Sequence, residues 1–138
     1  MKYLIYVSTA VKLMNDNELI DILKVSKRNN IAANVTGMLI YSDGVFMQVI
    51  EGADDEVRKI FQKIQVDARH NNIIKLTEGS LAERNFADWS MMFPSAKAED
   101  LENLGGYINP SNQYFMQTDN QHAAIIMLKT FAENNRII

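Results

Sequence analysis

A glutamine stands in the middle of an almost wholly apolar run of this 138-residue chain. Residues 45–50 read VFMQVI, between Gly44 and Glu51-Gly52, and Gln48 is the polar member. A glutamine amide has two donor hydrogens and one acceptor oxygen that need partners. Burying such a group unpaired costs about 1–3 kcal/mol. Gln48 is therefore either a satisfied structural amide or a contact to a bound polar ligand.

Other reactive side chains are few. The chain has no cysteine, and neither His70 nor His122 has metal-ligand spacing around it. We find no phosphate-cradling glycine loop with a paired basic residue and no evident nucleophile, which argues against an acylphosphatase-like hydrolase. The sequence therefore predicts a protein that is not an enzyme and holds no metal.

Length and composition favour one globular domain, with 47% apolar and 22% charged residues. The net charge of −3 argues against non-specific nucleic-acid binding. No apolar run approaches the roughly 20 residues that span a bilayer, so no membrane segment is expected. The absence of cysteine is compatible with a reducing compartment, and we expect a cytoplasmic protein.

The elements that must position Gln48 begin with a strand over residues 2–9, in which Tyr6 and Ser8 share a face. A helix of about 14 residues follows. Asn15 and Glu18 have the spacing of an N-cap and its N3 partner, and the helix is expected to end near Asn29-Asn30. Its residues Ile22, Ser26 and Asn30 are spaced by four and stack along one side, which turns from apolar to polar.

A hairpin is predicted over residues 35–41 and 45–51, with Asp43-Gly44 as its turn. The second helix is expected to start at Asp54 as N-cap, with an apolar stripe that includes Ile64. Residues 73–80 and 86–93 read as two further strands, the last stopped by Pro94.

The predicted order is β-α-β-β-α-β plus one strand, an α+β ferredoxin-like sandwich with both helices on one sheet face. The first and third strands then lie side by side in the middle, which makes Tyr6 and Gln48 cross-strand neighbours if both face the helices. A slip of one residue would turn Gln48 away. This arrangement would bring an oxidisable phenol within hydrogen-bond reach of the amide.

We divide the chain into a domain of residues 1–93 and a C-terminal extension of residues 94–138 with one or two helices. Residues 121–135 are predicted to be helical, with Ala124, Met127, Leu128 and Phe131 on one stripe. The second sheet face would otherwise be bare, so this helix either covers it or joins a partner chain.

Six motifs spread over residues 2–93 together resemble the BLUF family, the flavin-binding blue-light sensors. In order they are Tyr6-Val7-Ser8, Asn29-Asn30, Val35-Thr36-Gly37-Met38-Leu39, Phe46-Met47-Gln48-Val49-Ile50-Glu51-Gly52, Asp67-Ala68-Arg69-His70 and Trp89-Ser90-Met91. Val35 stands where isoleucine is commoner in the family. The resemblance does not extend through residues 94–138.

The resemblance implies that the ring of an FAD, or of FMN or riboflavin, lies between the two helices. The residues that match cofactor-binding positions, or lie on the same stripe, are Tyr6, Ile22, Ser26, Asn29, Asn30, Gln48, Lys63, Ile64, Asp67, Arg69 and His70. Ile22 and Ile64 would flank the ring, and Asn30 would bind its polar edge with Asn29 as a secondary contact. Lys63, Asp67, Arg69 and His70 would hold the ribityl and phosphate part.

The resemblance also implies a mechanism. Light drives electron transfer from Tyr6, a proton follows through Gln48, and Gln48 rearranges by rotation, tautomerisation or both, with a small red shift in absorption. Trp89 or Met91 would pack near Gln48, and the fifth strand would move and signal to the region after Pro94. The output would pass to a downstream partner protein, and a homo-oligomer is expected.

Each of these residues also has a plain structural alternative. Taken singly, Tyr6, Trp89 and Met91 are more often core residues, and Asn30 is more often a helix C-terminal residue. The Arg69-His70 pair could simply complement the carboxyl end of the second helix. At the level of the whole chain, the alternatives are an interaction module of the same fold that binds no flavin and a flavin reductase, although nothing suggests a nicotinamide site.

Overall fold

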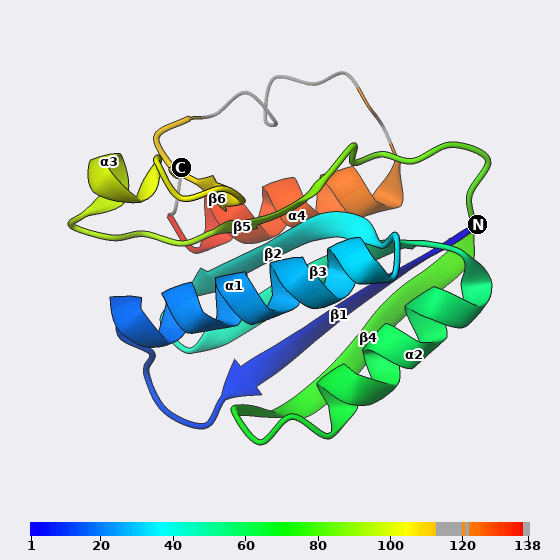
Figure 1. The fold of residues 1–138 in the computed structure, drawn as a ribbon, viewed down its shortest axis with the longest axis horizontal. Coiled ribbons are helices and arrows are strands. Elements are labelled where there is room, and N and C mark those ends of the chain that lie inside the picture. The colour runs from blue at the N-terminus through cyan, green and yellow to red at the C-terminus, as the bar shows by residue number, and fades with distance from the viewer. Residues whose placement is uncertain (113–119, 121, 137–138) are drawn as a thin grey trace.

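The computed structural model describes residues 1–112, 120 and 122–136. Its elements in chain order are β1 (Lys2–Ala10), α1 (Asp16–Ala32), β2 (Thr36–Ser42), β3 (Val45–Gly52), α2 (Asp54–Gln65), β4 (His70–Ser80), β5 (Trp89–Met92), α3 (Ala98–Leu101), β6 (Tyr107–Ile108) and α4 (Ala123–Asn134). Figure 1 shows α1 and α2 on one face of a sheet and α4 on the other.

The sheet has six strands in the order β4-β1-β3-β2-β5-β6. Its first four members follow the ferredoxin-like order, with β1 and β3 adjacent and antiparallel, as predicted. β5 then lies parallel to β2, and β6 lies parallel to β5. The sequence predicted one extra strand over residues 86–93, whereas the structure has two, and β5 covers only residues 89–92.

The start of α1 is set by a capping box. The backbone N–H of Glu18 donates to the Asn15 side chain (2.9 Å), and the Glu18 carboxylate accepts from the Asn15 N–H (3.2 Å). This reciprocal pairing satisfies two N–H groups that a helix start leaves free, as the spacing predicted. The helix runs to Ala32, two residues beyond the expected end.

The predicted N-cap of α2 is wrong. Ala53 occupies the cap position without a side-chain hydrogen bond, and Asp54 is already the first helical residue. Asp54 instead joins Asp55 and Glu56 in the first turn, where negative charge is favourable near the positive end of the helix dipole. The acidic residue thus predicted correctly that a helix starts here, but it did not identify the cap residue.

The hairpin of β2 and β3 fixes the register on which the site depends. Asp43 and Gly44 both have positive φ (45° and 86°), as the two central residues of a type I′ turn require. Leu39 then pairs with Gln48 on β3, and on the other side of that strand Tyr6 pairs with Gln48. The predicted cross-strand neighbours are therefore confirmed.

Each sheet face has its own covering. α1 and α2 contribute buried side chains such as Leu23 and Val57 on one face. On the other face, Leu128 and Phe131 of α4 pack in one cluster with Ile5 and Val49. Of the two arrangements considered for the terminal helix, the structure therefore has the one in which it covers the second face.

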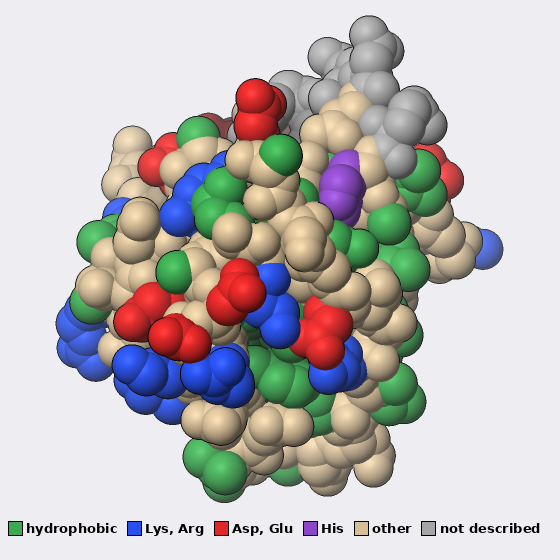
Figure 2. Space-filling view, turned by 90° about the vertical axis from the view of Figure 1, so that its right-hand side faces the viewer, with side chains coloured by type: hydrophobic (Ala, Val, Ile, Leu, Met, Phe, Trp, Pro, Cys, Tyr) green, Lys and Arg blue, Asp and Glu red, His purple; other side chains and the backbone are tan. Residues whose placement is uncertain are grey.

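Charged side chains of both signs are interspersed on the face shown in Figure 2. Ion pairs among the described residues include that between Lys2 and Glu78 (2.8 Å), which joins β1 to β4, and that between Arg58 and Asp55 (2.8 Å). Among the described residues, no helix combines the length and the apolar character that crossing a bilayer demands.

We expect Leu128→Ala to lower the free energy of unfolding by about 2–5 kcal/mol, because Leu128 is fully buried against the sheet and its truncation leaves a cavity. Chemical denaturation measures this change. Ile126→Ala on the same helix is the control, since Ile126 is 44% exposed and we expect a loss below about 1 kcal/mol. Equal losses in the two variants would contradict this docking of α4.

Candidate functional site

Gln48 lies between Tyr6 and Trp89 on the face of the sheet that α1 and α2 cover. Its Nε2 donates to the Tyr6 hydroxyl (2.6 Å), and its Oε1 accepts from the Trp89 indole Nε1 (3.0 Å). All three side chains are at most 4% exposed. The polar residue that the apolar run singled out is thus partnered by two aromatic side chains from β1 and β5.

The orientation of the Gln48 amide follows from the chemistry of its neighbours. An indole N–H can only donate, so the amide oxygen must face Trp89. The NH2 group then faces Tyr6, whose oxygen accepts. Turning the amide by half a rotation would bring its NH2 group against the indole N–H, and neither could accept. Trp89 therefore holds Gln48 in one of its two orientations.

The phenol of Tyr6 stays protonated in this setting. Burial raises the pKa of Tyr6 well above its ordinary value, the hydrogen bond from Gln48 lowers it, and the charge of Asp67 raises it further. Desolvation is the largest of these effects, because the phenolate loses hydration in an apolar surrounding. Removal of an electron from the neutral phenol would leave a positive charge, which burial disfavours. The loss of an electron from Tyr6 would therefore have to be accompanied by the loss of its proton.

A narrow slot between α1 and α2 leads to these side chains. Its volume is about 60 Å³, and its lining combines apolar walls with polar ends: Tyr6, Ile22, Ser26, Leu39, Phe46, Gln48, Ile64, Asp67, Arg69 and His70. Eight of these ten were predicted from the sequence. Leu39 and Phe46 were not, although their alternation with Gln48 and its neighbours along the hairpin could have indicated them.

The two helices that bound the slot pack on the sheet through separate apolar clusters. Ile22 of α1 belongs to a cluster with Leu39 and Trp89, whereas Ile60 of α2 belongs to one with Tyr6 and with Ile64 at its margin. The seam between α1 and α2 is thus a boundary between two packed units.

Charged and polar groups close one end of the slot. Arg69 makes ion pairs with Asp67 (Nη2 to Oδ2, 2.7 Å) and with Asp21 of α1 (3.8 Å), so it bridges the two sides. Hydrogen bonding from Arg69 lowers the pKa of Asp67. His70 contacts the Ile64 carbonyl through Nε2 (2.6 Å) and the Ser8 hydroxyl through Nδ1 (2.7 Å). A carbonyl only accepts, so Nε2 carries the hydrogen.

The remaining predicted cofactor residues lie apart from this slot. Asn29 and Lys63 line an open groove of about 580 Å³ between the outer sides of α1 and α2. Asn29 and Asn30, like Lys63 and Ile64, are consecutive on a helix and point about 100° apart, so both members of a pair cannot face one slot. Asn30 points inward and is 3% exposed.

The Asn30 side chain makes no hydrogen bond to any residue in the described part of the chain. Every side-chain nitrogen or oxygen atom that is fully buried among the described residues has a hydrogen-bond partner. The unpartnered amide atoms of Asn30 are therefore not fully buried, although the residue as a whole is only 3% exposed. An inward amide of this kind is suited to a ligand that supplies both a donor and an acceptor.

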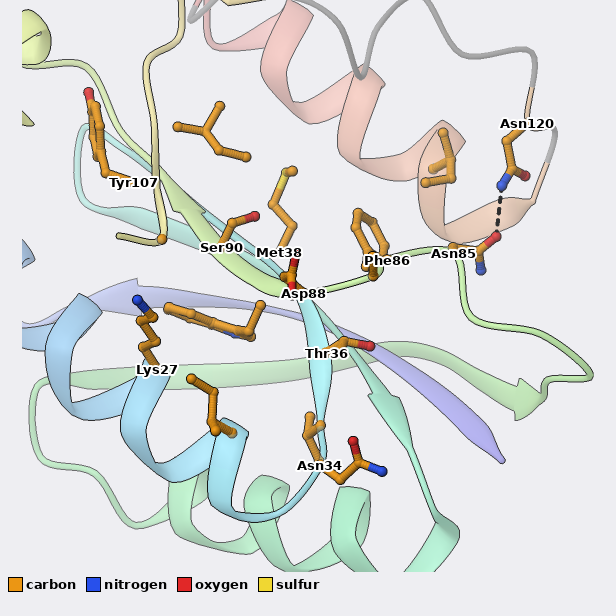
Figure 3. Close-up of a pocket in the computed structure, with 17 residues that line it drawn as sticks. Lys27, Asn34, Thr36, Met38, Asn85, Phe86, Asp88, Ser90, Tyr107 and Asn120 are labelled. Atoms are coloured by element: carbon orange, nitrogen blue, oxygen red, sulfur yellow. Dashed lines mark hydrogen bonds between the residues drawn. The ribbon is translucent and has the colours of Figure 1, made fainter. Parts of the chain in front are cut away.

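A larger cavity lies beyond Trp89, on the side away from the slot. It measures about 880 Å³ and is formed by Lys27 of α1, the chain around Asn85 to Ser90, and the strand β6 (Figure 3). Trp89 is thus a wall of this cavity and a partner of Gln48 at the same time. Met91 is fully buried beside β6 and lines neither space.

The lining of the slot fits a flavin ring: Ile22 and Ile64 offer apolar walls, and Gln48 offers a directed amide. The inward amide of Asn30, outside the lining, is a second candidate contact. The space in the slot is smaller than the roughly 300–1,000 Å³ of sites that enclose a cofactor-sized ligand. Holding the ring therefore requires α1 and α2 to move apart along the seam between their clusters.

Comparison with known proteins identifies the family. The family model described as "BLUF: Sensors of blue-light using FAD" matches residues 1–92. The chain therefore belongs to the BLUF family, whose members sense blue light and use FAD as the cofactor. The expected family, light-sensing function and cofactor are thereby confirmed.

Individual relatives agree with this assignment. The photoactivated adenylate cyclase subunit alpha of Euglena gracilis is 37% identical over 84 residues, which are 61% of this chain and 8% of that protein. Two solved structures are similar. The structure of BlsA in its photo-activated state has 31% sequence identity and a TM-score of 0.64, and the match covers 99% of this chain and 95% of BlsA. The dark-state structure of BlrB, a BLUF protein, has 32% identity and a TM-score of 0.62, and the match covers 75% of this chain and 83% of BlrB.

The chain spans only 8–10% of the length of the first curated relatives it matches. The shared part is the light-sensing region, and the similarity carries no cyclase activity to this chain.

We expect Asp67→Asn to lower the free energy of unfolding by less than about 1 kcal/mol at pH 7, because the pair with Arg69 is partly exposed and therefore screened by solvent. The folded-state pKa of Asp67 is lowered, so its contribution is present above the ordinary value and is lost as the pH falls below it. Denaturant titrations at pH 7 and pH 3 should show the difference from wild type shrinking in acid. Glu83→Gln, at an exposed carboxylate without an ion pair to the described residues, should change neither value. A pH-independent loss for Asp67→Asn would refute this reasoning.

Proposed function

We propose that Tyr6, Gln48 and Trp89 form the light-operated switch of this chain. The observation that carries the proposal is the continuous hydrogen-bonded series Tyr6–Gln48–Trp89 at the end of the slot between α1 and α2. A bound oxidised flavin would supply blue-light absorption and, once excited, an electron acceptor. The chain itself supplies the electron and proton donor and the group that changes its hydrogen bonding.

The cofactor ring would be held between Ile22 and Ile64, with Gln48 and Asn30 toward its polar edge. Two candidate paths exist for the rest of the cofactor. Asp67, Arg69 and His70 close one end of the slot, whereas Asn29 and Lys63 line the outer groove. The outer groove is large enough for a ribityl and phosphate chain, and the cation of Lys63 suits a diphosphate.

The switch operates on the orientation of the Gln48 amide. Tyr6 would give up an electron to the bound flavin, and its proton would follow through Gln48, because the buried phenol cannot remain charged. Both would later return to Tyr6. Gln48 then rearranges, by rotation or tautomerisation. A rotated amide would turn its NH2 group against the indole N–H of Trp89, so the bond between them must break. The rearrangement thus acts on Trp89 and on β5 directly.

The signal would leave through the chain that follows β5. We propose that residues 1–93 sense light, that residues 94–138 carry the response, and that the response reaches a downstream protein in the cytoplasm through a contact or a change of assembly, with a homo-oligomer as the resting form. Support comes from the position of β5 between the switch on one side and β6 on the other. Met91 belongs to this route through its backbone bond to Gly106 (2.8 Å).

The test is the absorption spectrum of the purified chain in the dark and just after blue light. We expect a yellow protein whose flavin bands shift slightly to the red and return in the dark. A colourless chain that takes up no added flavin would refute the proposal and leave an interaction module of the same fold.

Tyr6→Phe should keep the flavin bound and abolish the red-shifted state, because the substitution removes the hydroxyl that gives up the proton and leaves the aromatic ring in place. The same spectra measure the result. Tyr41→Phe is the matched control, since the Tyr41 hydroxyl accepts from the Met14 N–H away from Gln48 and its loss should leave the shift unchanged. A normal light response in Tyr6→Phe would rule out the role given to Tyr6.

A further inference from the structure

Glu51 is a carboxylate buried without exposure on β3, three residues after Gln48. It accepts from the backbone N–H of Asn85 (2.9 Å) and of Phe86 (2.9 Å), and from the Asn85 side-chain Nδ2 (2.8 Å). Because residues alternate between faces along a strand, Glu51 lies on the sheet face opposite to Gln48. Two polar side chains of one strand therefore serve the two faces of the sheet.

Further hydrogen bonds attach the segment before β5 to β2 and β3. Arg84, just before Asn85, donates to the Glu51 carbonyl (2.9 Å) and to the Thr36 hydroxyl (2.8 Å). The Asp88 carbonyl accepts from the Gly37 N–H (3.2 Å), and Trp89 follows. The segment that delivers Trp89 to Gln48 is thus attached to β2 and β3 at several points.

The same segment is also attached to α4. The Asn120 side-chain Nδ2 donates to Asn85 Oδ1 (2.8 Å), as Figure 3 shows, and Asn120 Oδ1 accepts from the His122 backbone N–H (2.8 Å). His122 is the N-cap of α4, where its Nδ1 accepts from the Ala124 N–H (3.1 Å). A continuous series of hydrogen bonds therefore runs from Glu51 to the first turn of α4.

The two ends of this series fix the direction of every bond in it. The Glu51 oxygens accept from Asn85, so Asn85 presents its NH2 group to Glu51 and its oxygen to Asn120. A backbone N–H only donates, so Asn120 must present its oxygen to His122. Neither amide can turn without placing two donors or two acceptors against each other.

We propose that Glu51 is a positioning residue that couples the Gln48–Trp89 switch to the first turn of α4. The inference rests on the proposed function and adds its route of regulation. When the Trp89 bond to Gln48 breaks, the segment from Asn85 to Trp89 shifts, and the oriented amides of Asn85 and Asn120 transmit the shift to the cap of α4. The apolar face of α4 covers the sheet, so a loosened first turn exposes that part of the helix to partners.

Glu51→Gln tests the coupling selectively. The new amide oxygen can still accept from the backbone N–H groups of Asn85 and Phe86, so Trp89 keeps its place. Its NH2 group meets the NH2 group of Asn85, and turning Asn85 would break the bond to Asn120. The variant should therefore retain the light-induced absorption shift and lose the connection to α4.

The measurement is backbone hydrogen exchange over residues 122–128 of the flavin-loaded chain, in the dark and under blue light, with absorption recorded on the same samples. In wild type we expect light to accelerate exchange there about fivefold or more, the lower range of usual coupling between sites. In Glu51→Gln we expect equal exchange in light and dark, with the absorption shift preserved.

Glu83→Gln is the matched control, since Glu83 lies in the same segment, is exposed, and makes no hydrogen bond or ion pair to the described residues. It should respond like wild type. If Glu51→Gln does not fold, Asn120→Ala removes the amide link and leaves Glu51 intact, and the same loss is expected.

Three outcomes separate the claims. No absorption shift in wild type contradicts the proposed function itself. A shift without any change of exchange at α4 in wild type overturns the coupling. A light-dependent change of hydrogen exchange at α4 that is as large in Glu51→Gln or Asn120→Ala as in wild type also overturns the coupling. A residue with a merely structural role would alter exchange equally in light and dark and would leave that difference unchanged.

Discussion

The indole N–H of Trp89 is the constraint on which the rest of this molecule depends. Because it can only donate, it sets the direction of the Gln48 amide, and that direction sets the contact with Tyr6. Without such a neighbour an amide in an apolar strand would have two orientations of similar energy. A single donor thus converts an ambiguous group into one with a defined ground state, which is the property a switch needs.

β3 holds the approach to β5 from both sheet faces. Gln48 binds the side chain of Trp89 on the face covered by α1 and α2, and Glu51 binds the backbone of Asn85 and Phe86 on the face covered by α4. β5 is only four residues long and its neighbour β6 only two, so few ladder bonds fix this edge of the sheet. Side-chain anchors from one strand do this instead, and both contain groups whose hydrogen-bond direction is fixed by their partners.

The hairpin, the capping box and the pairing of Tyr6 with Gln48 could all be predicted because each rests on local rules: a turn dipeptide, a fixed spacing and strand alternation. The cap of α2 could not, since a run of acidic residues does not show which one begins the helix. The length of β5 was overestimated because Arg84 and Glu51, distant in sequence, hold residues 84–86 as a loop. The argument that singled out Gln48 applied equally to Glu51, which was taken for the end of a strand.

The seam between α1 and α2 has a kinetic consequence. The apolar clusters of the two helices are separate, and the slot between them is narrow, with Arg69 bridging to Asp21 at one end. At the proposed site a ring would reach Gln48 only when the helices part, so the rate of loading would depend on how often they open as well as on how often cofactor and chain meet. The same barrier slows escape, which means that the chain would retain its pigment through many cycles of illumination even where free cofactor is scarce.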